Sequence, residues 1–280
     1  MKIGLNLWAY PDTTLLEEMF HQSSVAGFDG VEINLDERGY LTPETSKANV
    51  ESIARLARRH NLEISSVCSG LFWKYSLTSD TESERKTGLA IVKRMVEVAS
   101  WLGVARILVV PGAVENPFAT PVPAPVPYDV AYARALAALK EVSVWATQHK
   151  VHVGIENVWN KFLLSPLEMR HLIDEVASPF VGCYLDVGNV LALGYPEQWI
   201  RILGEHIRQI HVKDFKKTAM HSGTFVGLLE GDVDWIRIRE ALKAIEYRGY
   251  VVAELMPLRI YPEQRILQTA RVMSALFHER

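Results

Sequence analysis

Short apolar segments alternate with longer amphipathic segments eight times along the 280-residue chain. The apolar segments are rich in Val, Ile and Leu, as buried parallel strands are. They span residues 3–8, 30–35, 63–70, 106–112, 152–158, 181–189, 207–215 and 249–255. The amphipathic segments have the apolar spacing of helices and lie near residues 12–26, 43–60, 81–102, 129–149, 165–177, 196–205, 233–247 and 261–278. Strict alternation of strand and helix predicts a parallel sheet covered by helices.

Eight strand–helix units in 280 residues leave 35 residues for each unit, which suits a closed barrel. We therefore expect an α/β protein, a single (β/α)8 TIM barrel that spans residues 1–280 as one domain. The alternative is an open doubly wound sheet, but no strand-to-helix turn carries a G-x-G-x-x-G sequence. Segment 117–127 holds five prolines, and we interpret it as a stiff loop on the catalytic face rather than as a linker. The helix at 43–60 is expected to begin with Thr42 as its cap and Pro43 in its first turn.

The composition excludes several classes of protein and partner. Hydrophobic residues make up 49% of the chain and charged residues 22%, which excludes a disordered or fibrous protein. The net charge of −3 argues against nucleic acid and anionic membranes as partners, because both select basic surfaces. The chain has no 18-residue apolar run, and the apolar run at residues 1–12 is shorter than we expect of a signal peptide. It has only two cysteines, Cys68 and Cys183. We expect both to be buried free thiols, and the protein to be cytoplasmic.

Alternate side chains of a barrel strand point into the barrel and out toward the helices. In four successive strands, this alternation places an inward ionisable residue at the end of the strand; these residues are Glu156, Asp186, His211 and Glu254. Asn6 and Glu32 have the same inward orientation in the first two strands. Each ionisable residue taken alone is equally well explained as a loop cap or as the partner of a nearby Arg or Lys. Three converging carboxylates, however, cannot all stay ionised without a cation.

Three carboxylates and one imidazole form a hard-to-borderline ligand set. The sequence therefore predicts a divalent metal site made of Glu156, Asp186, His211 and Glu254. Mn²⁺ is the preferred ion, and Mg²⁺ and Co²⁺ also suit the ligands. Zn²⁺ is less favoured by so many oxygen ligands.

The four residues stand in the segments GIENVWN, YLDVGN, IHVKD and VAEL. These segments resemble the metal-site motifs of the xylose isomerase-like TIM barrels. That superfamily includes sugar-phosphate isomerases and epimerases, ketose 3-epimerases, inosose dehydratases and endonuclease IV. In the ketose 3-epimerases, the glutamates at the positions of Glu156 and Glu254 bind the metal and also act as opposed acid and base. Asn189 departs from the tagatose-type epimerases, which have a histidine there, and Lys216 and Lys217 stand where those enzymes have an arginine.

The resemblance implies a divalent-metal-dependent isomerase or epimerase of a sugar or sugar phosphate. Its glutamates would remove and return a proton next to a carbonyl, through an enediolate. One alternative is an inosose dehydratase-like lyase, which begins with the same proton abstraction and then expels a hydroxyl. A phosphodiesterase like endonuclease IV would need a larger, His-rich metal cluster and suits a net charge of −3 poorly. A barrel that binds a ligand without catalysis is the remaining alternative.

Further residues are expected to shape the substrate pocket. Phe72 and Trp73 lie in the aromatic segment 70–79, which either acts as a lid or packs against a neighbouring loop or subunit. Lys213 either reaches a substrate hydroxyl or phosphate or forms a salt bridge with an acid such as Glu254. The full predicted substrate-binding set is Asn6, Trp8, Glu32, Phe72, Trp73, Lys161, Asn189 and Lys213. Exposed loop aromatics also suggest a homodimer or a homotetramer.

Overall fold

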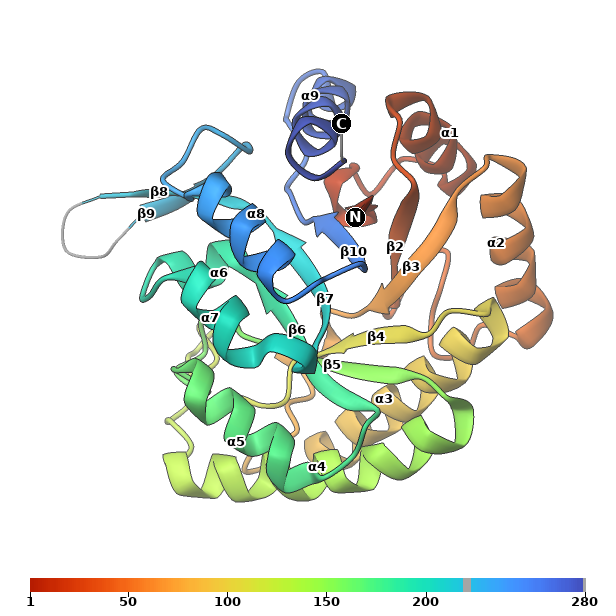
Figure 1. The fold of residues 1–280 in the computed structure, drawn as a ribbon. Coiled ribbons are helices and arrows are strands. Elements are labelled where there is room, and N and C mark those ends of the chain that lie inside the picture. The colour runs from red at the N-terminus through yellow and green to blue at the C-terminus, as the bar shows by residue number, and fades with distance from the viewer. Residues whose placement is uncertain (219–222, 279–280) are drawn as a thin grey trace.

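The computed structural model describes residues 1–218 and 223–278, and eight of its strands close into a parallel barrel (Figure 1). In barrel order, the strands are β1 (Lys2–Asn6), β2 (Gly30–Asn34), β3 (Glu63–Cys68), β4 (Arg106–Val109), β5 (His152–Glu156), β6 (Val181–Asp186), β7 (Ile207–Val212) and β10 (Tyr250–Ala253). β10 pairs with β1 and completes the circle. The predicted (β/α)8 TIM barrel is therefore confirmed.

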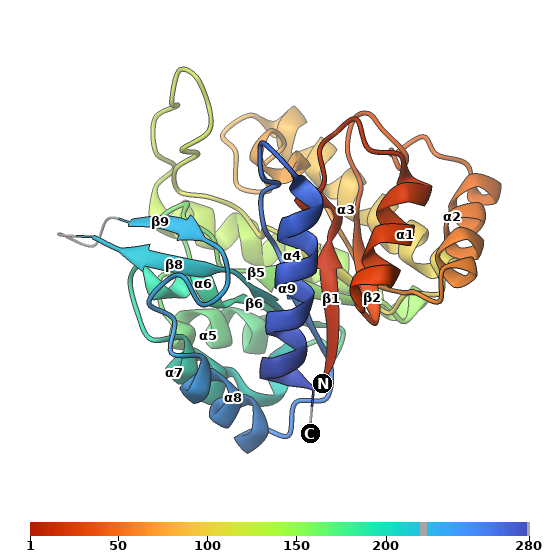
Figure 2. The same cartoon turned by 90° about the horizontal axis from the view of Figure 1, so that it is seen from above.

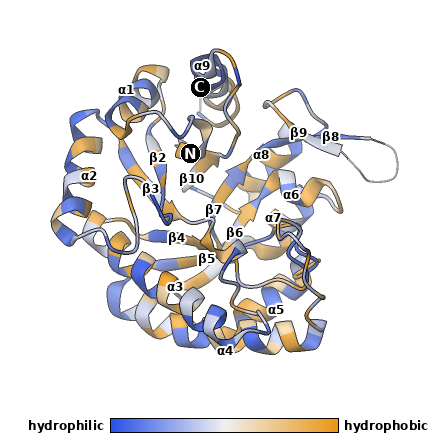
Figure 3. Cartoon of the chain, turned by 180° about the vertical axis from the view of Figure 1, so that it is seen from behind, coloured by the Kyte–Doolittle hydropathy of each residue, from blue (hydrophilic) through white to orange (hydrophobic). Residues whose placement is uncertain are grey.

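Helices surround the barrel, with apolar faces toward the strands and polar faces outward (Figure 3). They are α1 (Leu16–Ala26), α2 (Lys47–Arg59), α3 (Glu82–Leu102), α4 (Tyr128–His149), α5 (Pro166–Val176), α7 (Pro196–Leu203), α8 (Trp235–Ala244) and α9 (Pro262–Phe277). Cys68 and Cys183 are buried free thiols, as predicted. Among the described residues, no helix is both long enough and apolar enough to span a membrane.

All eight barrel strands are shorter than predicted, and in two of them a polar residue at the end of the strand caps a following helix. The side chain of Asn6 accepts a hydrogen bond from the Trp8 amide and begins the 3-10 helix η1 (Leu7–Ala9). The carboxylate of Asp186 accepts one from the Asn189 amide and begins the short helix α6 (Val187–Leu191). Trp8 and Asn189 therefore lie in helical turns at the mouth of the barrel.

The predicted start of the second helix is wrong. α2 begins at Lys47, and Ser46 caps it by accepting a hydrogen bond from the Asn49 amide. Thr42 instead lies in a turn, where its hydroxyl lies 3.2 Å from that of Thr45. A Thr-Pro pair suits a turn as well as a helix start, so the tertiary structure decides between the two.

A hairpin follows β7, where the sequence predicts one continuous strand. It consists of β8 (Asp214–Lys217) and β9 (Gly223–Val226), and it projects from the barrel (Figures 1 and 2). Buried Asp214 holds its base, since its carboxylate accepts hydrogen bonds from the Leu229 and Val233 amides and from Trp235 Nε1. The hairpin places aromatic side chains beside the mouth of the barrel.

The proline-rich loop follows β4 and also lies at the mouth of the barrel. Figure 2 shows it, in yellow-green, projecting from the end toward which the strands run. Its residue Phe118 lines the same cavity as Glu156 and Glu254. The predicted place of segment 117–127 on the face that carries the candidate site is therefore confirmed.

Replacing Gly154 with Ala should destabilise the barrel. A Cβ atom at residue 154 would lie 2.8 Å from the Cβ atom of Tyr184, a side chain that is fully buried in the barrel. Overpacking of this kind costs about 1–3 kcal/mol, so thermal unfolding should show a lower Tm. Gly70→Ala is the control, because a Cβ there meets nothing closer than 3.7 Å. Equal Tm values for the two variants would contradict this account of the packing.

Candidate metal centre and active site

Four neighbouring barrel strands bring the predicted metal ligands together. Glu156 ends β5, Asp186 ends β6, His211 lies in β7, and Glu254 follows β10. One ligand atom from each side chain lies within 4.8 Å of the others. The register explains this proximity in part, because Asp186 and His211 are direct partners across β6 and β7.

His211 is held from below by Glu32. Its Nε2 atom lies 2.6 Å from Glu32 Oε2, while its Nδ1 atom faces the cluster, 3.4 Å from Glu156 Oε1 and 3.8 Å from Glu254 Oε2. A proton on Nε2, donated to Glu32, leaves Nδ1 with a lone pair for a metal ion. This is the carboxylate–histidine arrangement that orients metal ligands in proteins.

A buried polar network fixes Glu32. Its carboxylate accepts hydrogen bonds from the Tyr184 hydroxyl, from Ser66 Oγ at 2.7 Å and from Asn6 Nδ2 at 2.6 Å. Burial opposes ionisation of Glu32, but His211 and these hydrogen bonds lower its pKa to about 2. Asn6 and Glu32 are both fully buried beneath the cluster. The structure therefore places them as supports of His211 rather than in the lining of the cavity.

Lys213 is the cation nearest to the carboxylates. Its Nζ atom lies 2.5 Å from Glu254 Oε2 and 3.0 Å from Asp186 Oδ2, and it also stands 4.8 Å from the centre of the Phe225 ring. Burial disfavours the ammonium, but the Asp186 and Glu254 carboxylates raise its pKa and keep it charged. The predicted salt bridge to Glu254 is thus present, and a contact with substrate stays a prediction.

The other ionisable groups respond to burial in different ways. Burial raises the pKa of Glu156 to about 7, and the nearby Glu254 carboxylate adds to the rise, against a hydrogen bond from His211. Burial also raises the pKa of Asp186, although Lys213 opposes this. Burial acts in the same direction on Glu254, but Lys213 and His211 outweigh it and lower the pKa.

The donor set fits a divalent cation. Four carboxyl groups, counting Glu32, face one lysine and one histidine inside the barrel. Asp186 Oδ2 is fully buried, and the Lys213 ammonium 3.0 Å away is shared with Glu254, so one cation serves two carboxylates. A buried carboxylate oxygen without a hydrogen-bond donor is costly unless a cation compensates it. Glu156, Asp186, His211 and Glu254 therefore form a candidate metal centre, and oxygen-rich ligands of this kind suit hard divalent ions.

A cavity of about 180 Å³ opens above the cluster. Of the predicted substrate-binding residues, Trp8, Trp73, Asn189 and Lys213 line it. Phe72 is buried in the hydrophobic core instead, because η2 (Leu71–Trp73) turns its ring inward. Lys161 does not line the cavity either; its exposed side chain pairs with Glu115 at 2.8 Å.

Three aromatic residues of the cavity wall are absent from the sequence-based set. Phe118 comes from the proline-rich loop, Trp159 from the loop after β5, and Phe225 from the hairpin. Trp159 stacks on Phe225 with ring centres 4.8 Å apart, which joins the two loops. Only Trp159 carried a usable signal, since it lies three residues after Glu156 in the segment GIENVWN.

Asn157 is also absent from the predicted site residues, although it follows Glu156 directly. Its side-chain amide donates to the Asp186 carbonyl, and its Oδ1 atom accepts from the Asp186 amide. Asn189 donates from its side-chain amide to the Asn157 carbonyl. These bonds tie the ends of β5 and β6 together and so set the spacing between two candidate ligands.

A comparison of the sequence with known families agrees with the barrel fold. Residues 20–276 match the model of the xylose isomerase-like TIM barrel. The chain belongs to this family. Because that match spans nearly the whole barrel, the resemblance inferred from the four short segments is confirmed.

Relatives and solved structures agree with the family. An L-ribulose-5-phosphate 3-epimerase of Shigella flexneri is 24% identical over 90% of this chain and 86% of its own length. A putative L-ribulose-5-phosphate 3-epimerase of Escherichia coli is 26% identical over 90% and 88%. A crystal structure of a D-psicose 3-epimerase has a TM-score of 0.81 at 17% identity and covers both chains completely. The last likeness concerns the fold alone.

Replacing Glu32 with Gln should weaken metal binding without removing a ligand. The amide cannot accept the Nε2 proton as a carboxylate does, so His211 loses its orientation and part of its basicity. Loss of such a partner lowers metal affinity about 10-fold to 100-fold, which calorimetric titration with Mn²⁺ measures. The control is Glu63→Gln, which removes an exposed carboxylate paired with Lys2. Unchanged affinity in Glu32→Gln would contradict the role assigned to Glu32.

Metal affinity should also fall as the pH drops below 7. In that range Glu156 carries a proton, and a metal ion has to displace it. Burial opposes the charged form of His211, but Glu32 and the other carboxylates raise its pKa, so its Nδ1 proton must leave as well. Each displaced proton weakens the apparent affinity about tenfold per pH unit. Titration with Mn²⁺ in buffers of different ionisation enthalpy counts these protons. A constant affinity from about pH 7.5 to about pH 5.5 would exclude this linkage.

Proposed function

We propose that the chain is a divalent-metal-dependent isomerase or epimerase that acts on a sugar or a sugar phosphate. The observation that carries the proposal is the differing exposure of the four candidate ligands. Asp186 and His211 are completely buried, whereas 7% of the Glu156 side chain and 18% of the Glu254 side chain are exposed. Both glutamates line the cavity. Two of the four ligands can therefore reach a substrate as well as a metal ion.

Two carboxyl groups in contact with one substrate can remove and return a proton. One glutamate takes the proton from the carbon next to a carbonyl, and the electrons of that C–H bond move into an enediolate. The other glutamate returns a proton. Return to the same carbon from the opposite face gives epimerisation, and return to the neighbouring carbon gives isomerisation. Glu156 and Glu254 lie at the two ends of the row of four strands, as a pair that acts from different sides requires.

The surroundings support the same chemistry. A divalent ion held by Glu156, Asp186, His211 and Glu254 would supply positive charge for the enediolate oxygens. Trp8, Trp73, Phe118 and Trp159 wall the cavity and limit the access of water to a reactive carbanion equivalent. The names of the relatives, an L-ribulose-5-phosphate 3-epimerase and a putative one, support a sugar as substrate. The metal identity, a cytoplasmic location and a homodimer or homotetramer stay predictions.

Incubation with ketoses and ketose phosphates in D₂O tests the proposal. The protein is saturated with Mn²⁺ during the incubation. A chelator then removes the ion, and proton NMR shows which carbon-bound hydrogen has exchanged with solvent. The expected result is exchange at one carbon next to the carbonyl. A product that has lost water would favour the dehydratase alternative. No exchange with any sugar would overturn the proposal and favour a barrel that only binds a ligand.

Glu254→Gln should suppress this exchange while substrate binding persists. An amide cannot take up or give back the proton, and general acid–base catalysis contributes about 100-fold to 10,000-fold to a rate. Metal content has to be measured in parallel, so that loss of the acid or base is separated from loss of the ion. Glu63→Gln again serves as the surface control. A Glu254→Gln variant that exchanges at the original rate would remove Glu254 from the mechanism.

A further inference from the structure

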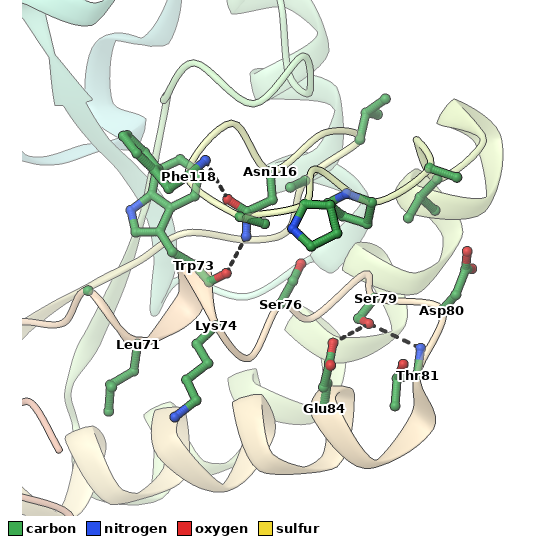
Figure 4. Close-up of a pocket in the computed structure, with 18 of the residues that line it drawn as sticks. Leu71, Trp73, Lys74, Ser76, Ser79, Asp80, Thr81, Glu84, Asn116 and Phe118 are labelled. Atoms are coloured by element: carbon green, nitrogen blue, oxygen red, sulfur yellow. Dashed lines mark hydrogen bonds between the residues drawn. The ribbon is translucent and has the colours of Figure 1, made fainter.

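A second cavity, of about 730 Å³, adjoins the cavity above the candidate metal centre, which we call the metal cavity. Figure 4 shows residues that line the second cavity. The loop after β3 and the start of α3 form one wall, the loop after β4 forms the other, and Asp36 and Glu37 come from the loop after β2. Trp73 and Phe118 line both cavities, so the two spaces share an aromatic border. The metal cavity alone, at about 180 Å³, is smaller than the roughly 300–1,000 Å³ of usual small-molecule sites. A ligand larger than one sugar ring therefore has to extend past this border.

The aromatic border is built by contacts between the two loops. The rings of Trp73 and Phe118 meet edge to face, with centres 4.7 Å apart. Asn116 connects them, since its amide donates to the Trp73 carbonyl at 2.5 Å and its Oδ1 atom accepts from the Phe118 amide at 3.0 Å. Phe118 is nevertheless 71% exposed. An exposed aromatic ring held in place at the edge of a polar cavity offers a surface for an apolar face of a ligand.

The rest of the second cavity is polar and negatively charged. The charged residues of its lining are four acids and one lysine, namely Asp36, Glu37, Asp80, Glu84 and Lys74. Lys74 is already paired with Glu37 at 2.5 Å, and Asp80 is paired with Arg134 at 2.7 Å. Among the described residues, Asp36 and Glu84 are the two acids of this lining without a salt bridge. Such a lining repels a phosphate or a carboxylate, whereas carboxylate oxygens accept hydrogen bonds from neutral hydroxyl groups.

Hydroxyl groups complete the far end of this cavity. Ser79 and Thr81 lie near Glu84 in the view of Figure 4, at the opposite end from Trp73 and Phe118. Ser79 Oγ donates to Glu84 Oε2 at 2.6 Å and accepts from the Thr81 amide at 3.0 Å. Aromatic rings at one end, with hydroxyls and carboxylates at the other, match an uncharged polyhydroxylated ligand.

We propose that this cavity is a subsite for a second, uncharged sugar unit. The inference rests on the proposed function, because it places the reacting sugar over the metal centre and the second unit against Trp73 and Phe118. The substrate is then a glycoside of a keto sugar rather than a phosphorylated ketose. Binding of the second unit positions the reacting carbon, and binding energy from such a remote group raises the rate of the chemical step.

Four sugars test this assignment by their exchange rates in D₂O with saturating Mn²⁺. They are D-fructose, D-fructose 6-phosphate, and two glucosyl-fructoses, maltulose and isomaltulose, in which glucose is attached to O4 or O6. At low substrate concentration, at least one glucosyl-fructose should exchange about tenfold faster than fructose, a factor that a modest remote contact provides. Fructose 6-phosphate should show no such gain. Saturation-transfer NMR should show contact of the glucosyl protons with the protein.

Ala124→Trp is designed to fill the second cavity and leave the metal cavity intact. Ala124 is an exposed residue of the proline-rich loop that lines only the second of the two cavities. The variant should lose the preference for the glucosyl-fructose while fructose exchanges at the original rate. Val122→Trp is the matched control, because Val122 is exposed on the same loop and lines neither cavity. This control should keep the preference.

The outcomes separate the two proposals. Exchange on fructose without a glucosyl preference, or a preference that survives Ala124→Trp, overturns the subsite and leaves the proposed function standing. Faster exchange on fructose 6-phosphate than on both glucosyl-fructoses also overturns it, in favour of a phosphate. No exchange with any of these sugars or with the panel described above overturns the proposed function, and the subsite with it.

Discussion

The carboxyl groups of Glu32, Glu156, Asp186 and Glu254 lie together inside the barrel, where little water can solvate them. Cations or hydrogen-bond donors must compensate their negative charge, and the rest of the site depends on this constraint. Glu32 is satisfied by His211 and by a network of neutral donors. Asp186 and Glu254 share Lys213, and Glu156 lies 3.4 Å from His211 Nδ1. Because desolvated carboxylates of like charge repel strongly, this arrangement is stable only with a cation at its centre or with protons on some of the acids. The same demand makes the cluster a candidate for a divalent ion.

The site combines a rigid part with a variable part. The candidate ligands stand at or beside the ends of barrel strands, and Asn157 and Glu32 fix their positions by hydrogen bonds. The walls that would contact a substrate come instead from loops that carry Trp73, Phe118 and Phe225. Strands hold reacting groups to the tolerance that catalysis requires, and loops change size and chemistry without disturbing the barrel. The second cavity, made almost wholly by two such loops, is therefore where substrate choice is expected to reside.

Residue alternation explains why the metal centre could be predicted. In β7 the side chains of Gln209 and His211 both point inward, and the same count places Glu156 and Asp186 correctly in their strands. Residue alternation does not determine where a strand stops. Asp214 and Lys216 continue the same run of residues but belong to a hairpin outside the barrel. The Leu229 and Val233 amides donate hydrogen bonds to the Asp214 carboxylate, and these bonds fix the start of the hairpin. The local sequence pattern does not predict them, because the donors lie 15 and 19 residues after Asp214.

The sequence by itself determined the eight-unit barrel, the buried cysteines and the four residues that converge at its mouth, because each follows from a period of apolar and polar residues. Only the tertiary structure decided that Phe72 packs in the core while Trp73 next to it lines the cavity. It also decided that Lys213, for which the sequence allows a substrate contact or a salt bridge, pairs with two of the candidate ligands. The second cavity, enclosed by two loops some forty residues apart in the sequence, follows from the tertiary structure alone. The physical reason is that periodicity specifies which face of an element is buried, whereas loop contacts depend on side chains that meet only after the barrel has closed.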